Sequence, residues 1–346
     1  MEIVSRPHHT SFIRWAATRP RVLVLTADLT ASCEADGFRD AFPERCFSMG
    51  MAEQNMVGFA AGLAREGFSP WLHTFAVFLT RRVFDQVAMA VAYPNLRVRL
   101  CGFLPGITTP GGVTHQAVDD LALMRVLPNM TALECGDATE VESFPDVAEA
   151  VDGPVYVRVL RGEVPRLFPR DRPLELGRAR ELSRGEDVTV ISSGICTEEA
   201  LRVVAALRGR AGSPGLRLLH VSTLKPFTDQ AVLAAVLQPR CGVITLENHS
   251  VVGGLGSAVA EVMAEHGAGR PLVRLGLQDV YAHGASRRWL MREHGLDAAA
   301  LLRAVERLID QPLGLSVEEL DAQDPVPGLD GAAAPAPAPA ERVEDL

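Results

Sequence analysis

Short apolar runs alternate with amphipathic stretches along most of this 346-residue chain. Runs typical of buried strands cover residues 21–29, 96–103, 130–136 and 155–160 in the first half and residues 187–194, 216–223, 242–248 and 272–277 in the second. Between these runs, apolar residues recur at helical spacing, which predicts helices over residues 52–66, 74–92, 115–127, 139–151, 197–209, 228–238, 255–266 and 297–309. Such alternation is typical of mostly parallel sheets covered by helices, so the predicted fold class is α/β.

The two blocks are separated by residues 162–186, which hold three prolines and many charged residues without sustained periodicity. We therefore expect a first domain over residues 1–168, a linker over residues 169–185 and a second domain over residues 186–312. Residues 313–346 are expected to form a disordered acidic tail, because the run AAAPAPAPA within them cannot bury a core.

The charge is concentrated in that tail. The chain has a formal net charge of −9, and residues 317–346 hold eight acidic residues and one Arg. The remainder is close to neutral, which gives no electrostatic reason to expect nucleic acid or a membrane surface as a partner. Since no apolar stretch is long enough for a membrane span and the N-terminus has no signal pattern, we expect a cytoplasmic protein. The six cysteines show no ligand-like spacing, and no metal site is predicted.

The most unusual local feature is Glu53, in the segment FSMGMAEQNMVGFAAGLAREG. It lies where a strand-like run meets a helix whose following residues are nearly all small or apolar. A carboxylate in this position is expected to be half-buried and to have a specific partner. An acid in the first turn of a helix also interacts well with the macrodipole, so position alone leaves a purely structural role open.

Blocks of sequence in both halves carry a resemblance to a known family. After Glu53 come WLHTFAVFLTRRVFDQ (71–86), the segment 101–133 with its PGGVTHQ loop, and GPVYVRVLRGEVP (153–165). In this order they resemble the pyrimidine-binding domain of the transketolase family of thiamine diphosphate enzymes. The later blocks HVSTLKPFTDQAV, LENHSVVGGLGSAVAEVMAEHG and LVRLGLQDVYAHG resemble successive blocks of the family's C-terminal domain. The resemblance covers about residues 10–310.

The resemblance implies a catalytic role for Glu53. In these enzymes a Glu at this position contacts N1′ of the cofactor's aminopyrimidine ring, and sharing a proton there activates the cofactor as a nucleophile toward a ketose carbonyl. A buried carboxyl suits this relay better than a solvated one. The implied activity is transfer of a two-carbon ketol unit between sugar phosphates, with thiamine diphosphate as the cofactor.

The resemblance also implies roles for three ring-bearing residues. Phe75 and Phe78, in TFAVF, fall where the family places aromatic rings around the pyrimidine, although Phe78 fits a plain core position equally well. His115, in GGVTHQ, matches a catalytic His at the sugar-binding mouth of the site. An imidazole there exchanges hydrogen bonds or a proton with donor hydroxyls.

Three polar residues have weaker counterparts in the family. Asp28, in TADLT, matches an acid at the subunit interface near the cofactor, or is a surface acid at the end of a strand. Ser32 and Arg161 match positions that hold the phosphate of a sugar phosphate, a group that the planar fork of Arg binds well. For Arg161 a surface ion pair is the alternative.

The family binds the diphosphate and Mg²⁺ through a separate domain that carries GDG followed at a distance by Asn. The sequence contains no GDG, and the two expected domains and the tail use the whole chain. The resemblance therefore implies one subunit of a split transketolase, whose partner is an N-terminal subunit with the GDG…N motif that binds most of the Mg²⁺ and diphosphate. The implied assembly is a heterotetramer, a dimer of two such heterodimers.

Two departures from the family affect the expected substrate. Gly111 stands where the family has an Asp that binds a donor hydroxyl, and Phe103 or Leu104 stands where it often has His. Losing two polar groups from the sugar pocket predicts a shifted donor or acceptor. A related thiamine-dependent carboligase, a 2-oxoacid dehydrogenase β-type subunit and a non-catalytic scaffold subunit are the alternatives. The TFAVF and THQ blocks favour transketolase over the dehydrogenases, and Glu53 argues against a scaffold.

Overall fold

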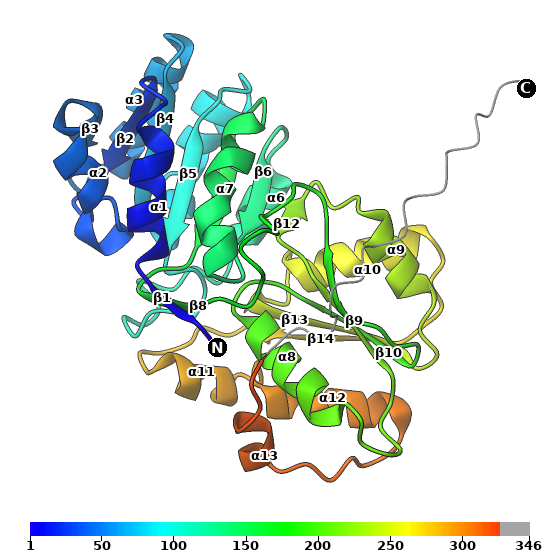
Figure 1. The fold of residues 1–346 in the computed structure, drawn as a ribbon. Coiled ribbons are helices and arrows are strands. Elements are labelled where there is room, and N and C mark those ends of the chain that lie inside the picture. The colour runs from blue at the N-terminus through cyan, green and yellow to red at the C-terminus, as the bar shows by residue number, and fades with distance from the viewer. Residues whose placement is uncertain (326–346) are drawn as a thin grey trace, which may run out of the picture.

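The structure is a computed structural model that describes residues 1–325, so the Pro/Ala-rich part of the expected disordered tail lies outside the described residues. Two sheets, each covered by helices on both faces, follow one another along the chain (Figure 1). The α/β fold class predicted from the sequence is confirmed. Within the described part of the chain, no helix has the length and apolar character needed to cross a membrane.

The first sheet has seven strands, and all but one of them are parallel. Their order across the sheet is β12 (Thr223–Lys225), β6 (Thr131–Glu134), β7 (Val155–Val159), β5 (Arg99–Phe103), β4 (Ser69–Phe75), β2 (Val22–Thr26) and β3 (Cys46–Ser48). Every residue of the four central strands is buried, which explains why most of them read as apolar runs. Only β12, which comes from the second half of the chain, runs antiparallel.

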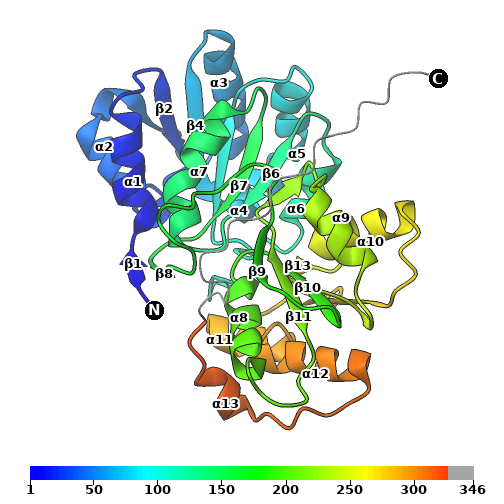
Figure 2. The ribbon, with the colours of Figure 1, turned by 45° about the vertical axis from the view of Figure 1, so that its right-hand side comes forward.

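Helices cover both faces of this sheet. Figures 1 and 2 show α1 and α7 side by side over one face. That face carries α1 (Pro7–Ala16), α2 (Asp36–Ala41) and α7 (Ala138–Ala150). The other carries α3 (Glu53–Arg65), α4 (Ala76–Thr80), α6 (Asp120–Val126) and the short helices α5 (Phe84–Gln86) and η3 (Val87–Ala92). Single turns η1 (Ala31–Cys33) and η2 (Pro43–Arg45) complete this half.

The second sheet has five strands. Their order is β14 (Leu272–Leu277), β13 (Gly242–Ser250), β10 (Val188–Ser192), β11 (Leu216–His220) and β9 (Arg180–Ser183), of which only β9 is antiparallel. Its helices are α8 (Cys196–Leu207), α9 (Gln230–Leu237), α10 (Leu255–Glu265), α11 (Arg287–Glu293), α12 (Ala298–Ile309) and α13 (Val317–Asp321). A two-stranded antiparallel ribbon of β1 (Ile3–Ser5) and β8 (Glu163–Pro165) lies below α1 in Figure 2.

The structure differs from the expected elements in five places. The stretch 74–92 is not one helix, because residues 69–75 form β4 at the centre of the first sheet. The helix expected at 115–127 begins only at Asp120, after a loop. The run 216–223 ends as a strand at His220, and the chain then crosses to the first sheet as β12. Part of the segment 162–186 forms β8 and β9, and part of the expected tail forms α13 with a capping box at Ser316.

Two buried histidines form a pair, and this pair allows the buried strand β4 to hold the polar side chain of His73. His8 on α1 and His73 on β4 are fully buried, with 2.9 Å between their Nε2 atoms. Nδ1 of His73 lies 3.3 Å from the carbonyl oxygen of Trp71, so His73 donates there and accepts a hydrogen bond from His8. Burial lowers the pKa of His73 to about 4, and burial together with His73 lowers the pKa of His8 well below its ordinary value.

This pair is expected to make the chain less stable in mild acid. Both rings are neutral in the folded chain, whereas in the unfolded chain the same histidines bind protons once the pH falls below their ordinary pKa of about 6.5. The free energy of unfolding is therefore lost as the pH falls from about 6.5 toward 4, with His73 alone contributing about 2 kcal/mol between pH 7 and pH 5. Urea unfolding at both pH values checks this, and the double variant His8→Leu/His73→Leu should show a smaller difference between them.

Phe103→Leu is the matched control, because Phe103 packs against both rings but does not titrate. It should lower the free energy of unfolding by the same amount at pH 7 and pH 5. If the double histidine variant keeps the pH dependence of the wild type, the two histidines are not its source.

Candidate functional site

The residues singled out in the first half of the sequence gather at one edge of the first sheet. Phe75 is the last residue of β4, and Asp28 and Arg161 follow the ends of β2 and β7. Glu53 begins α3, the helix that follows β3. Because these strands are parallel, their carboxyl ends lie at the same edge, which is where ligands bind in open α/β sheets.

Glu53 is buried and has one specific partner. Its residue is 2% exposed, and Nη1 of Arg82 lies 2.8 Å from each of its carboxylate oxygens. The Arg82 side chain is 45% exposed, and its guanidinium carbon lies 4.2 Å from the centre of the Phe78 ring. The sequence predicted a partner for Glu53 but did not identify Arg82, which is 29 positions away.

Three rings form a cluster beside this ion pair. The rings of Phe75 and Phe78 are 6.0 Å apart and nearly parallel, with 22° between their planes. His115 meets both rings edge-on, at 6.1 Å from Phe75 and 5.7 Å from Phe78. Its Nδ1 lies 2.8 Å from the hydroxyl of Thr114. Through Arg82 and Phe78, the structure brings Glu53, Phe75, Phe78 and His115 into one continuous group.

This group fits one half of a thiamine cofactor. A carboxylate has about four lone-pair sites, so Glu53 retains capacity beyond its two contacts with Arg82 to accept from a ring nitrogen. The neighbouring aromatic rings offer flat apolar faces to a planar heterocycle. In residues 1–325, no three His, Cys, Asp or Glu side chains lie close enough together to hold a metal ion.

The residues expected to bind phosphate form a second group. Nη1 of Arg161 donates to the carbonyl oxygen of Ser32 at 3.0 Å, and Arg161 is exposed. The adjacent Gly162 donates to the carboxylate of Glu34 at 2.7 Å, which fastens the end of β7 to the Ser32 turn. Asp28 is exposed in a left-handed conformation with φ 61°, and it forms no ion pair within the described part of the chain.

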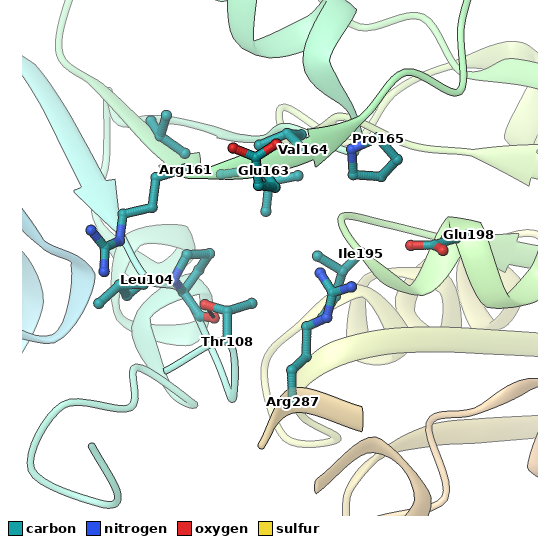
Figure 3. A pocket seen from close by; sticks show the side chains of 13 residues that line it. Leu104, Thr108, Arg161, Glu163, Val164, Pro165, Ile195, Glu198 and Arg287 are labelled. Carbon is teal, nitrogen blue, oxygen red and sulfur yellow. Dashed lines mark hydrogen bonds between the residues drawn. The ribbon is translucent and has the colours of Figure 1, made fainter. Parts of the chain in front are cut away.

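The two departures from the family pattern have different surroundings. Phe103 is fully buried and faces the two core histidines, whereas Leu104 is left-handed with φ 55° and lines a cavity between the two halves. Figure 3 shows Leu104, Thr108 and Arg161 on one side of this cavity and Ile195, Glu198 and Arg287 on the other. At Gly111, a Cβ atom would lie 3.1 Å from Cβ and Cγ of His115, so Gly leaves room for that ring.

Removing Arg82 is expected to leave the Glu53 carboxylate buried without its counter-charge. Arg82→Met should lower the free energy of unfolding by about 1–2 kcal/mol, less than for a fully buried pair because Arg82 is half exposed. Adding Glu53→Gln should recover most of that loss, since a neutral amide needs no ion pair. Urea unfolding of the two single variants and the double variant measures the coupling.

Arg65→Met is the control, because Arg65 is an exposed residue in the last turn of the same helix. It should change the free energy of unfolding by less than about 0.5 kcal/mol. Strictly additive effects of Arg82→Met and Glu53→Gln would mean that the two side chains are not coupled.

Comparisons with known proteins identify the family to which both halves of the chain are similar. The family model described as "Transketolase, pyrimidine binding domain" matches residues 9–166, and the model described as "Transketolase, C-terminal domain" matches residues 177–301. The 6-deoxy-6-sulfo-D-fructose transketolase subunit SqwH of Clostridium sp. is 38% identical over 301 residues, covering 86% of this chain and 92% of that protein.

Two further matches differ in how much of the other protein they cover. The 1-deoxy-D-xylulose-5-phosphate synthase of Stutzerimonas stutzeri is 33% identical over 294 residues, which is 84% of this chain but 45% of that enzyme. A solved structure described as a split gene transketolase in an inactive β4 tetramer is 38% identical, with a TM-score of 0.79 and coverage of 88% of this chain and 97% of that one. The chain therefore belongs to the transketolase family and is a subunit of its split type, with a pyrimidine-binding domain followed by a C-terminal domain.

Proposed function

We propose that this subunit supplies the pyrimidine-binding half of a thiamine diphosphate site that transfers a two-carbon ketol unit between sugar substrates. The observation that carries the proposal is the buried Glu53 carboxylate at the sheet edge, next to the rings of Phe75, Phe78 and His115. When bound, the cofactor supplies the nucleophile and the electron sink.

Each residue of the group has a distinct task in this proposal. Glu53 binds N1′ of the aminopyrimidine and shares a proton at that atom, and Arg82 turns partly away or shares the carboxylate when the ring arrives. Phe75 and Phe78 fix the plane of the ring by stacking. His115 hydrogen-bonds to the hydroxyls of the sugar and moves a proton there, because an imidazole both donates and accepts.

The second group binds the far end of the sugar. Arg161 lies against the backbone of Ser32, so a guanidinium and a Ser residue are neighbours here, and the two side-chain types suit a tetrahedral anion. A relative named for a sulfonated fructose supports either a phosphate or a sulfonate as that anion. Asp28 is placed by the proposal at the contact with the neighbouring subunit, since it is exposed at the same sheet edge.

An exposed face of α3 supports a partner subunit next to Glu53. Gly58 and Gly62 are exposed with open space where a Cβ would stand, and Phe59 between them is 43% exposed. Phe59 contacts Phe47, which is 36% exposed, and Met51, just before the start of α3, is 80% exposed. Apolar side chains and small residues gathered on one helix face are typical of a surface that another chain covers.

That partner is proposed to be the subunit with the GDG…N motif, which binds the diphosphate and Mg²⁺. A solved relative described as an inactive tetramer of β subunits is consistent with a chain that needs a second kind of subunit for activity. The proposed assembly is a heterotetramer with two copies of each chain, and its sites lie between chains.

Cofactor binding is expected only in the mixture of the two subunits. Calorimetric titration of thiamine diphosphate with Mg²⁺ should give weak or no binding to this chain alone and tight binding to the complex. Glu53→Gln should lower turnover of the complex about 10²–10⁴-fold, because the amide cannot share a proton with N1′.

Glu66→Gln is the matched control, since Glu66 is exposed just past the end of the same helix. It should leave both binding and turnover unchanged. Full cofactor-dependent activity of this chain without a partner would contradict the split arrangement, and unchanged turnover in Glu53→Gln would contradict the catalytic role.

The donor preference is expected to depend on Gly111. Gly111→Asp places a carboxylate beside His115, where it accepts a hydrogen bond from a donor hydroxyl. The kcat/KM for hydroxylated ketose phosphates should rise about tenfold relative to Gly111→Ala, the worth of one charge-assisted hydrogen bond. Gly111→Ala is the control, because it crowds His115 equally without the carboxylate. Equal selectivity of the two variants across several ketose phosphates, 1-deoxy sugars and sulfonated sugars would contradict the role of this position.

A further inference from the structure

Residues 104–119, here called the His115 loop, run from the end of β5 to the start of α6. The two ends of the loop meet at a neck. The backbone N–H of Gly106 donates to the carbonyl oxygen of Ala117 at 2.8 Å, and Pro105 and Ala117 form an isolated bridge. The neck holds the two ends together, so whatever fixes the neck also fixes the base of the loop that carries His115.

A side chain of the C-terminal domain is inserted at this neck. Asn248, on β13 of the second sheet, is 1% exposed. Its Oδ1 accepts from the backbone N–H of Ile107 at 2.9 Å, and its Nδ2 donates to the carbonyl oxygen of Pro105 at 3.1 Å. The amide thus supplies the acceptor for the buried N–H of Ile107 and adds a donor to the carbonyl oxygen of Pro105, which also accepts from the N–H and the hydroxyl of Thr108.

The fit between this amide and the loop is close. Gly106 is left-handed with φ 56°, and a Cβ there would lie 2.2 Å from Oδ1 of Asn248 and 2.4 Å from Cγ. Gly106 is therefore required twice, by its backbone conformation and by the approach of Asn248. The contact therefore depends on one residue from each domain, Gly106 and Asn248.

Other contacts fasten the same loop to the C-terminal domain. Gln116 is 1% exposed, and its Nε2 lies 3.3 Å from the carbonyl oxygen of His283 and 3.3 Å from that of Thr109. Just after the loop neck, the backbone N–H of Ser250 donates to the carbonyl oxygen of Val118 at 2.8 Å. The C-terminal domain therefore holds the His115 loop both at its neck and next to His115.

We infer that Asn248 is a positioning residue, through which the C-terminal domain sets the place of His115 in the sugar-binding site. The inference rests on the proposed function, in which His115 contacts the substrate. It gives the C-terminal domain a part in the reaction although every candidate site residue belongs to the first domain.

Asn248→Ala in the assembled two-subunit enzyme tests this inference. The backbone amide of Ile107 loses its acceptor, so its hydrogen exchange should become at least about tenfold faster. The kcat/KM should fall about 10–100-fold, the size expected when a reacting group is misplaced by about an ångström. The KM for the donor sugar should rise by more than the affinity for thiamine diphosphate falls, because Glu53, Phe75 and Phe78 belong to β4 and to helices outside the His115 loop.

Gly106→Ala approaches the same contact from the other side, and it also serves if Asn248→Ala folds poorly. Its Cβ displaces the Asn248 amide, so it should show the same faster exchange and the same rise in donor KM. The double variant Gly106→Ala/Asn248→Ala should be no worse than the more severe single variant, since removing the amide makes room for the Cβ.

Thr189→Val is the matched control. Thr189 is a buried residue of the same sheet whose hydroxyl donates to the carbonyl oxygen of Ala235 at 2.8 Å, far along the chain from the loop. It should lower stability but leave the exchange of Ile107 and the donor KM unchanged.

The outcomes separate this inference from the proposed function. An active wild-type complex with an unchanged donor KM in Asn248→Ala overturns the inference, and so does unchanged exchange at Ile107. A wild-type complex that shows no ketol transfer overturns the proposed function instead, and the exchange measurement then still reports whether Asn248 holds the loop.

Discussion

The joining of the two domains depends on the hydrogen bonds and ion pairs that the guanidinium of Arg158 forms. It is fully buried on β7, with its Nε and Nη2 atoms each 2.7 Å from one oxygen of Asp120 and its Nη1 2.7 Å from Glu134. Nη1 and Nη2 also donate to the carbonyl oxygens of Asn248 and Ala117, at 3.1 and 2.9 Å. One side chain thereby ties the first sheet, the start of α6, the His115 loop and the second sheet together. Its loss would leave two acids buried without a counter-charge, at a cost of about 3–5 kcal/mol.

Protonation on the C-terminal side limits the negative charge of this cluster. Burial alone would raise the pKa of Asp120, but Arg158 lowers it below its ordinary value. Glu247 lies on the neighbouring β13, where burial, together with the nearby Glu134, raises its pKa to about 8. Glu247 is therefore mostly protonated at neutral pH and adds little negative charge beside the two acids. A cluster with one unit of net charge is easier to bury than one with two, so the raised pKa of Glu247 favours the burial of this cluster.

The sequence predicts the fold well where burial alone determines it. The β5 and β7 strands are buried on both faces, so they stand out as apolar runs such as LRVRLCGF and VYVRVL. The β4 strand is buried equally, but His73 within it is paired with His8 on α1, a tertiary contact that no local pattern reveals. Arg99 and Arg158 are charged residues within buried strands. No local pattern reveals how they are satisfied either, because their partners come from distant segments.

The same distinction between local sequence features and distant contacts applies to the candidate site. Glu53 could be found because its place between a strand and a small-residue helix is a local feature, and the family resemblance then gave its companions. Arg82 and Asn248 could not be assigned, since their partners lie 29 and 141 positions away. A signal for Asn248 was nevertheless present in the sequence, because GVITLENH carries three polar residues in succession at the end of an otherwise apolar strand. Buried polar residues must be satisfied by partners, so such a cluster marks a contact with another element.

In the proposed function, the pairing of Glu53 with Arg82 allows the acid that binds the cofactor to be buried before the cofactor is present. A carboxylate that is 2% exposed needs a counter-charge until the cofactor arrives, and Arg82 supplies it from the side that faces solvent. Because Arg82 is 45% exposed, its charge stays hydrated, and the ion pair contributes much less than a fully buried one. In the proposed function, Arg82 would therefore give up part of the carboxylate at small cost when a ring nitrogen binds. A fully buried partner such as Arg158 could not be displaced in this way, which is why one arginine suits a binding site and the other suits the joint between domains.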